Sequence, residues 1–513
     1  MRHSSSFHHE SIAFFETELF KRIQLEGLFN DSKTICDAKP NSSWLELVTL
    51  YEKDKNQVAF SLSEFVGAHF TLPQEIVLNA SGSPASLAEY IQSLWPKLTR
   101  APDNNQSNST LMALHHPYII PGGRFREIYY WDSYFTALGL KLSSHTRLIE
   151  SMVLNFIDLQ DTLGCIPNGN RSYYYSRSQP PVLAMMVDLC MENSDSVDHD
   201  FMQRCLTGME QEYRFWMRGQ DQLNGPGEAC YRTVSMPCGA VLNRYWDDLA
   251  TPRSESYLED VELAAEFSAP QRPEFYRNIR AACESGWDFS SRWLADERTL
   301  SSIQTTKIVP VDLNCLLYRL EATLGKYHKL LGQDVQGALF VALANRRKEA
   351  INRYFWSAEQ NYYFDYQFEQ QQPLPVRSLA GALPLYVNIA SEQQAKCVKH
   401  SLMSTFLRDG GLVTTLNTSG QQWDSPNGWA PLQWFAVVGL RNYDYIQDGD
   451  DIMQRWLKTV QGHFAASGNI MEKYNVQSLD SLADGGEYEV QHGFGWTNGV
   501  TMAFYDLLAK SNT

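Results

Sequence analysis

Apolar residues recur along much of this chain with the spacing of an α-helix. In residues 148–160 they fall at positions i, i+3, i+4, i+7 and i+8, namely Ile149, Met152, Val153, Phe156 and Ile157. This spacing places all of them on one face of a helix. Gly164 follows as a stop signal. An amphipathic helix is therefore expected here, with its apolar face toward a core.

The same pattern recurs in residues 313–324, where leucines share one face and Pro310 and Asp312 supply a start signal. Further helical windows lie at 201–217, 274–283, 335–355, 392–407 and 450–463. Strand-like alternation is scarce, and its clearest example is "NYYFDYQF" (361–368), which predicts a small hairpin. The chain is therefore predicted to be mainly α-helical.

The strongest local change in composition is the polar segment "APDNNQSNST", residues 101–110. Such a segment is either a linker between domains or a surface loop. The loop is favoured because the clusters of aromatic and acidic residues described below lie on only one side of it and continue to residue 498. We therefore expect one catalytic domain over residues 1–513, with residues 1–110 as an N-terminal extension packed onto it.

Composition excludes several classes of protein. With 513 residues, of which 43% are apolar and 12% aromatic, the chain can bury a large core. Its net charge of −16 would repel the backbone of a nucleic acid. No segment approaches the roughly 18 apolar residues of a membrane span. We therefore expect neither nucleic-acid binding nor membrane insertion.

The N-terminal residues and the cysteines bear on the cellular compartment. Residues 1–20 contain no apolar run followed by a small-residue cleavage site, so they do not resemble a signal peptide. The nine cysteines are odd in number and include no CxxC pair, which argues against both a disulfide framework and a zinc site. A cytoplasmic protein with reduced, mostly buried thiols and no bound metal is expected.

Tryptophan and aspartate stand side by side at residues 131–132, 246–247, 287–288 and 423–424. The steps of 115, 41 and 136 residues between these pairs exclude the regular repeat of a propeller. A sugar ring has C–H faces that pack on aromatic rings and hydroxyl groups that pair with carboxylates, Arg and Asn. For any single pair the alternative is a half-buried Trp beside a capping or ion-paired Asp. Recurrence in separate segments favours a helical enzyme that handles sugars.

Two longer segments carry a specific resemblance. "PGGRFREIYYWDSYF" (121–135) and "QWDSPNGWAP" (422–431) resemble the two signature segments of the trehalase family of glycoside hydrolases, which hydrolyse α,α-trehalose to glucose. Other segments resemble family segments in the same order: "DSKTICDA" (31–38), "IPNGNRSYYYSRSQPP" (166–181), "ESGWDFSSRW" (284–293), "PVDLN" (310–314), "EKYNV" (472–476) and "GGEYEVQHGFGWTNGV" (485–500). The resemblance spans essentially the whole chain.

This resemblance implies an all-α fold, the (α/α)6 barrel, in which six helical hairpins form a toroid with the site in a pocket at one end. By position, Asp288 corresponds to the general acid and Glu472 to the general base. The substrate-binding set corresponds to Arg124, Trp131, Asp132, Asn168, Arg177, Ser178, Gln179, Arg253, Glu255, Gly286 and Glu487. Ser254 stands where the family has proline between Arg253 and Glu255, and a less rigid loop is expected there.

The chemistry of acetal hydrolysis explains these residue types. An inverting glycosidase needs one protonated carboxyl group at the leaving oxygen and one carboxylate that holds a water on the opposite face of the sugar. Enclosure of Asp288 by Trp287 and other indoles is expected to raise its pKa by desolvation. Arg124, Arg177 and Arg253 can orient carboxylates and donate to sugar hydroxyls, beyond the ion pairing that is their ordinary role.

Three functions stay open at this point: an active trehalase, a trehalose-binding sensor without turnover, and another inverting α-glucosidase on the same barrel. The enzyme is favoured because a sensor would be expected to have replaced Asp288 or Glu472, and both are present. No phosphate-binding glycine pattern or metal-ligand cluster is found in the sequence, so no cofactor is expected. The expected partner is a small molecule, trehalose, bound by a monomer.

Overall fold

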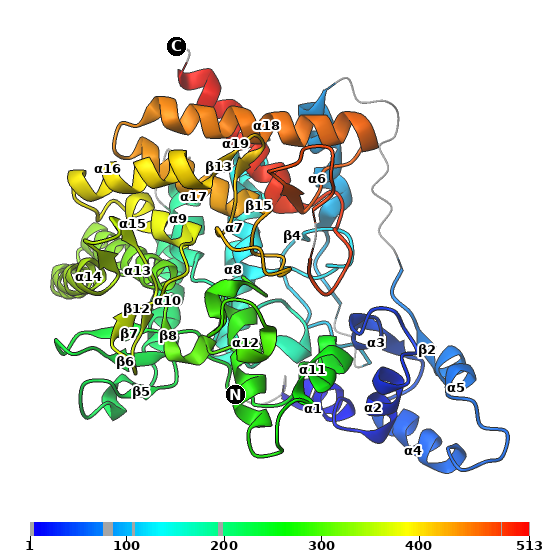
Figure 1. Ribbon diagram of the computed structural model, residues 1–513. Coiled ribbons are helices and arrows are strands. Elements are labelled where there is room, and N and C mark those ends of the chain that lie inside the picture. Colours follow the sequence, from blue (N-terminus) through cyan, green and yellow to red (C-terminus); the bar gives the residue numbers. More distant parts are fainter. Residues whose placement is uncertain (1–4, 75–85, 105–107, 193–197, 484, 512–513) are drawn as a thin grey trace.

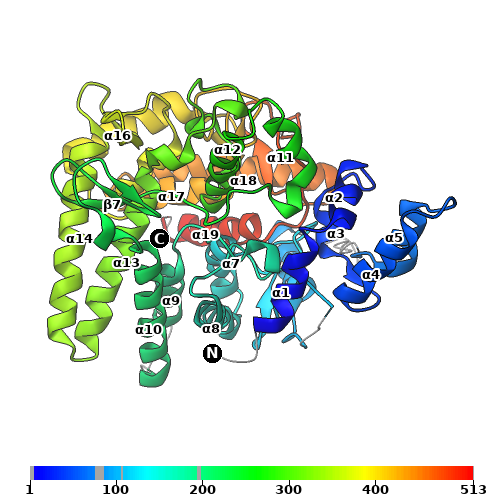
Figure 2. The same cartoon turned by 90° about the horizontal axis from the view of Figure 1, so that it is seen from below.

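A closed ring of helices forms the centre of the protein. The computed structural model describes residues 5–74, 86–104, 108–192, 198–483 and 485–511. The inner ring consists, in order, of α7 (Tyr130–Leu142), α9 (Leu183–Met191), α13 (Val311–Leu330), α15 (Leu383–Tyr386), α17 (Ala430–Arg441) and α19 (Gly495–Ser511). Each inner helix packs against the next, and α19 closes the ring by packing on α7. Figure 2 shows α19, in red, crossing the centre near α7 and α17.

A second set of helices lies outside this ring: α6 (Leu87–Leu98), α8 (Thr146–Leu163), α10 (His199–Trp216), α14 (Asp334–Tyr354), α16 (Glu392–Ser401) and α18 (Ile446–Ser467). α6 packs on α19, α8 on α7 and α9, α10 on α9 and α13, α14 on α13, and α18 on α17 and α19. Every residue of α7 from Tyr130 to Leu140 is buried, whereas α8 buries mainly one face. An inner helix has neighbours on all sides and an outer helix faces water. These two rings confirm the expected (α/α)6 barrel.

The helical windows inferred from the sequence are helices in the structure. Residues 148–160 lie within α8, which ends at Gly164 in the left-handed conformation, with φ at 84°. Residues 313–324 lie within α13, which begins directly after Pro310. The windows 201–217, 274–283, 335–355 and 450–463 correspond to α10, α12 (Arg272–Glu284), α14 and α18. The window 392–407 is less regular, since α16 ends at Ser401 and a π-helical turn follows over Leu402–Phe406.

Residues 361–368 contain two strands, but these do not pair with each other, as a hairpin over this segment would require. β10 (Tyr362–Tyr363) pairs with β9 (Trp356–Ser357), whereas β11 (Tyr366–Gln367) lies between β8 (Ile308–Val309) and β12 (Gln372–Pro373). Asp365, between β10 and β11, is buried and accepts hydrogen bonds from Arg292 and from the backbone N–H of Val311. These long-range bonds fix the chain between two separate sheets, so alternation along the segment could not reveal its partners.

The remaining strands are short pieces that join loops. They are β1 (Lys39–Pro40), β2 (Phe70–Thr71), β3 (Thr99–Arg100), β4 (Tyr118–Ile119), β5 (Ala229–Cys230), β6 (Thr233–Ser235), β7 (Val241–Asn243), β13 (Leu407–Arg408), β14 (Gly411–Leu412), β15 (Asn427–Trp429) and β16 (Lys473–Asn475). β15 and β16 pair antiparallel, with Trp429 opposite Lys473. This pairing joins the segment before α17 to the segment after α18.

The N-terminal helices pack against one side of the barrel, as Figures 1 and 2 show in blue. They are α1 (Ser5–Phe14), α2 (Glu18–Leu25), α3 (Lys33–Asp37), α4 (Trp44–Asp54) and α5 (Leu62–His69). Their apolar residues form a second core, which also takes in Tyr129, Tyr173 and Tyr174 from the barrel. α2 further packs on α11 (Tyr257–Ala264). α1 to α5 thus lie beside the barrel, whereas α6, which also falls within residues 1–110, belongs to the outer ring; the division into one catalytic domain and an extension stays a prediction.

The length and polarity of the helices also bear on membrane association. Across the residues that the structure describes, none of the helices combines the length and the apolar character that a membrane crossing demands.

Candidate active site

A pocket lies at the end of the barrel where several inner helices begin. Trp131 and Asp132 lie in the first turn of α7, Trp429 directly precedes α17, and Trp496 is the second residue of α19. The segment after α12 contributes Asp288. The cavity has a volume of about 90 Å³. Segments that are far apart in the sequence therefore face one cavity.

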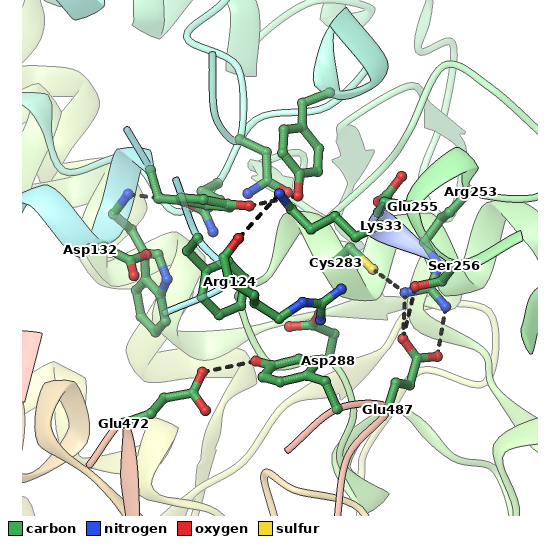
Figure 3. Close-up of a pocket in the computed structure, with 18 of the residues that line it drawn as sticks. Lys33, Arg124, Asp132, Arg253, Glu255, Ser256, Cys283, Asp288, Glu472 and Glu487 are labelled. Carbon is green, nitrogen blue, oxygen red and sulfur yellow. Dashed lines mark hydrogen bonds and ion pairs between the residues drawn. The ribbon is translucent and has the colours of Figure 1, made fainter. Parts of the chain in front are cut away.

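The structure brings together all but one of the residues that the sequence singled out. The pocket is lined by Arg124, Trp131, Asp132, Asn168, Arg177, Gln179, Arg253, Glu255, Gly286, Asp288, Glu472 and Glu487. Figure 3 shows the acidic members of this set, among them Asp132, Asp288 and Glu472, around the cavity. Ser178 is buried behind the pocket wall, where its backbone N–H donates to Oε1 of Glu284 at 3.0 Å. Its part in substrate binding stays a prediction.

Asp288 lies in a setting that favours its protonated form. Burial is the largest cause and raises the pKa of this carboxyl group to about 7; the nearby Arg253 acts in the opposite direction, and Glu487 raises the pKa further. Trp287, the residue before it, is fully buried and stacks on Trp423 with ring centroids 5.5 Å apart. At neutral pH a substantial fraction of Asp288 therefore carries a proton that it can donate.

Indole rings form one wall of the pocket. Trp423 lies flat against Trp429, with ring centroids 3.8 Å apart and planes at 2°. The edge of Trp496 meets Trp429 at 81°. Gly286 passes so close to Trp131 that an added Cβ atom would lie 2.8 Å from Cε2 of that ring. Such a wall offers apolar faces to the C–H side of a sugar.

The two carboxylate oxygens of Glu472 differ in their hydrogen bonding. The hydroxyl of Tyr488 donates to its Oε1 at 2.8 Å. Its Oε2 is buried and, among the described residues, accepts no hydrogen bond, although Nζ of Lys473 lies 3.6 Å away. β16 begins at Lys473, and its pairing with β15 fixes this stretch of backbone. Glu472 therefore has one fixed oxygen and one that can accept a proton from a bound water.

Hydrogen bonds between further pocket residues hold the polar groups of the site in place. Nε of Arg177 donates to Oδ1 of Asn168 at 3.2 Å, and its Nη2 donates to Glu255. The side chain of Gln179 accepts the backbone N–H of Trp131 at 3.1 Å. These bonds join the loop before α9 to the start of α7 and to the loop after Arg253. The guanidinium group of Arg177 is therefore held in place before a ligand binds.

The loop with Ser254 in place of proline is anchored by the N-terminal extension. Ser254 lies in a single 3-10 turn, Ser254–Ser256. Its carbonyl oxygen accepts from Nε2 of Gln24 at 3.0 Å and from Sγ of Cys36 at 3.1 Å. These contacts from α2 and α3 supply the restraint that a proline ring would have given, so the expected loss of rigidity does not follow from the substitution.

Several buried polar atoms in the pocket wall lack a hydrogen-bond partner among the described residues. They are Nε of Arg124, Nη1 of Arg177, Oε2 of Glu255 and Oε2 of Glu472. Leaving a buried donor or acceptor unpaired costs free energy, so such atoms mark where a ligand or water binds. Asp132 adds a further donor, because burial, followed by the charge of Glu472, raises its pKa well above the ordinary value. The pocket thus presents both donors and acceptors to a polyhydroxylated molecule.

Comparison with known proteins agrees with this arrangement. The family model described as Trehalase matches residues 27–509. The chain belongs to the trehalase family. A periplasmic trehalase of Citrobacter koseri is 46% identical over 492 residues, which cover 96% of this chain and 85% of that protein. A periplasmic trehalase of Escherichia coli (strain SMS-3-5 / SECEC) is 44% identical over 492 residues, which cover 96% of this chain and 86% of that protein.

Solved structures of trehalase-family and related barrels extend the comparison. The neutral trehalase of Saccharomyces cerevisiae is similar with a TM-score of 0.64 and 26% identity, over 83% of this chain and 81% of that one. A GH63 mannosylglycerate hydrolase from Thermus thermophilus, in complex with Tris and D-glycerate, has a TM-score of 0.51 and 17% identity, over 76% of this chain and 96% of that one. The second likeness shows the fold alone.

The expectation of a cytoplasmic protein is wrong, because the trehalases that match 96% of this chain at 46% and 44% identity are periplasmic. The cysteines do not distinguish the two compartments. All nine thiols are free, and six of them are buried. A buried thiol is inert and shielded from oxidants in either compartment, so the lack of disulfides does not report the location of this trehalase-family chain.

Sequence reasoning overlooked several residues of this trehalase-family pocket. Tyr488 directly follows Glu487 and binds Glu472, and Lys33 reaches the pocket from α3. Both lie within segments that resemble the family, and this resemblance is the feature of the sequence that could have pointed to them. Phe125 and Phe494 complete the apolar lining. Their partners are distant in sequence, so only the folded chain shows what they contact.

Proposed function

We propose that this protein hydrolyses α,α-trehalose to two glucose molecules by a single displacement with inversion. Asp288 is the general acid and Glu472 the general base. The observation that carries this proposal is the pair of carboxyl groups that line one pocket, of which Asp288 has a pKa of about 7 and Glu472 has an Oε2 that accepts no hydrogen bond among the described residues. Membership of the trehalase family supports the choice of substrate.

The reaction needs one proton delivered and one removed. Asp288 gives its proton to the oxygen that joins the two sugars, as the bond from that oxygen to C1 of one glucose breaks. A water attacks C1 from the opposite face, and Oε2 of Glu472 takes the proton that this water loses. Asp288 ends as a carboxylate and Glu472 as a carboxylic acid. Exchange of protons with solvent restores both groups.

The surrounding residues suit the bound disaccharide. The stacked indoles of Trp423 and Trp429 give the pocket a rigid apolar wall, which suits the C–H side of a pyranose. The unpaired atoms of Arg124, Arg177 and Glu255 match hydroxyl groups, which both donate and accept. Binding energy from these contacts orients C1 between the acid and the base. No step requires a redox change or a group that the sugar and water do not supply.

Glucose release from trehalose tests the proposal. The wild type is compared with Asp288→Asn and Glu472→Gln, which keep the shape of each side chain but remove proton transfer. We expect each substitution to lower kcat by about 10²–10⁴-fold with little change in the thermal midpoint or in the binding of trehalose. Near-normal turnover by Glu472→Gln would contradict the assignment of the base, and Glu487 would be the next candidate.

The same experiment separates the alternative functions. A wild type that binds trehalose without releasing glucose would be a sensor. A wild type that cleaves maltose faster than trehalose would be another α-glucosidase on this barrel. Both sugars are therefore assayed side by side at the same concentrations.

We further propose that the chain acts as a monomer in the periplasm. The described residues of one chain line the whole pocket, so a second subunit is not needed to complete it. The periplasmic location of the Citrobacter koseri and Escherichia coli relatives supports the compartment. Trehalase activity in the periplasmic fraction, and a mass near 58.6 kDa by light scattering, are the expected results.

A further inference from the structure

A residue outside the barrel reaches the candidate active site. Asp31, just before α3, accepts a hydrogen bond from Nη2 of Arg124 through Oδ1 at 2.7 Å. The same oxygen accepts the backbone N–H of Lys33 at 2.9 Å. Asp31 thus fixes the start of α3 and holds an arginine of the pocket at the same time.

α3 gives this contact a rigid base. Lys33 is buried, and its Nζ pairs with Asp37 and with Glu127 at 2.8 Å. Arg171 pairs in turn with Glu127 at 3.0 Å. This cluster joins the N-terminal extension to the segment before α7 and to the loop before α9. Asp31 is therefore held in place relative to the barrel.

The contact continues from Arg124 to the candidate base. The guanidinium carbon of Arg124 lies 4.4 Å from the ring centroid of Tyr488, which is within the range of a cation–π interaction. The hydroxyl of that ring donates to Oε1 of Glu472 at 2.8 Å. Figure 3 shows Arg124, Glu472 and the hydrogen bond to the base. The three contacts form an unbroken path from Asp31 to Glu472.

We propose that Asp31 and Tyr488 are positioning residues for the general base Glu472, with Arg124 as the link between them. Asp31 fixes the plane of the guanidinium group, and that plane fixes the ring of Tyr488. The tyrosine hydroxyl then donates its hydrogen bond to Oε1 of Glu472. The other carboxylate oxygen, Oε2, is left to accept a proton from the attacking water. This inference rests on the proposed function, because it assigns a role to residues around the base of that reaction.

Solvent exposure separates this role from a purely structural one. The side chain of Asp31 is 37% exposed. Arg124 is only 14% exposed, but the Asp31 end of the pair is open to water, which screens the contribution of its charge to the stability of the fold. Removing its charge should therefore leave the fold intact and change catalysis, because small errors in the position of a catalytic group have large effects on rate.

The test compares Asp31→Asn, Tyr488→Phe and the double variant with the wild type. We expect each single variant to lower kcat on trehalose by about tenfold or more, the order of a lost charge-assisted hydrogen bond, with an unchanged thermal midpoint. Because both act on the same oxygen, the double variant should be no slower than the slower single variant. Asp31→Glu keeps the charge and should recover part of the lost kcat.

Ser32→Ala is the matched control. It lies next to Asp31 and loses a hydrogen bond to Glu259 but leaves the contact with Arg124 in place. Its kcat should equal that of the wild type. Wild-type kcat in Asp31→Asn, or losses that multiply in the double variant, would overturn the inference. Failure of the wild type to hydrolyse trehalose would instead overturn the proposed function, so the two outcomes are distinct.

Discussion

The guanidinium group of Arg253 holds both oxygens of Glu487, with Nη2 2.8 Å from Oε1 and Nη1 3.1 Å from Oε2. This pair joins the loop before α11 to the segment before α19, and it lies beside Asp288 (Figure 3). Its two charges act in opposite directions on the pKa of Asp288, which burial raises to about 7. The pair therefore adjusts the pH range in which the proposed acid keeps its proton.

The first prediction concerns Glu487→Gln. Activity needs Asp288 protonated, so kcat/KM should fall as pH rises through about 7. Removing the Glu487 charge leaves Arg253 as the stronger neighbour and lowers the pKa of Asp288, so this alkaline limb should move to lower pH. The pH profile of kcat/KM on trehalose measures the shift.

Glu489→Gln is the control for this prediction. It changes an exposed carboxylate two residues away and should leave the alkaline limb at the same pH. A limb that moved to higher pH in Glu487→Gln would contradict the prediction.

The second prediction concerns the stereochemistry of the products. If Glu472 activates water, Asp288 and Glu472 should lie about 6.5–9.5 Å apart across the bound sugar, whereas a nucleophile would require about 5–5.5 Å. The attacked glucose then leaves as the β anomer, and the other glucose keeps its own C1–O bond and leaves as the α anomer. Proton NMR, recorded before mutarotation, should show equal amounts of both. Product that is entirely α would mean retention through a covalent intermediate.

The third prediction concerns the close approach at Gly286. Alanine there would place Cβ 2.8 Å from Cε2 of Trp131, and the backbone has φ at +74°. We expect a raised KM for trehalose and a loss of about 1–3 kcal/mol in the free energy of unfolding, because the ring must move. Gly468→Ala is the control, since its φ of +72° is nearly the same and nothing lies within 4 Å. If both variants lost stability equally and kept the same KM, the crowding of Trp131 would not matter.

The fourth prediction concerns the buried cation that anchors α3. Lys33→Met removes the ammonium group that pairs with both Asp37 and Glu127 and leaves Arg171 beside these two buried carboxylates; breaking a buried pair costs about 3–5 kcal/mol in the free energy of unfolding. Denaturant unfolding followed by tryptophan fluorescence measures this. Lys55→Met is the control, because Lys55 pairs with the exposed carboxylate of Glu18 and a smaller loss is expected. Equal losses of unfolding free energy in the two variants would show that burial of the lysine charge does not determine its contribution to stability.

The sequence by itself determined the helices and the chemistry that the chain carries. The apolar spacing of residues 148–160 and the glycine at Gly164 set the outer helix α8 and its end, because the period of a helix is a local property. The resemblance around Trp131, Asp288 and Glu472 supplied residue types that fit acetal hydrolysis, and these residues do line one pocket. Its position-by-position assignment also extended to Ser178, which lies behind the wall.

Only the tertiary structure decided which of these groups meet. Asp31 and Arg124 are 93 residues apart in the chain, and their contact exists because α3 lies beside the segment before α7, where Lys33 pairs with Glu127. β10 and β11 are neighbours in sequence but join different sheets. The pKa of Asp288 depends on burial and on the charges of Arg253 and Glu487, which lie far from each other in the sequence. Such properties arise when the barrel closes, because closure brings distant charges into a medium of low dielectric constant, and no local pattern along the chain encodes that.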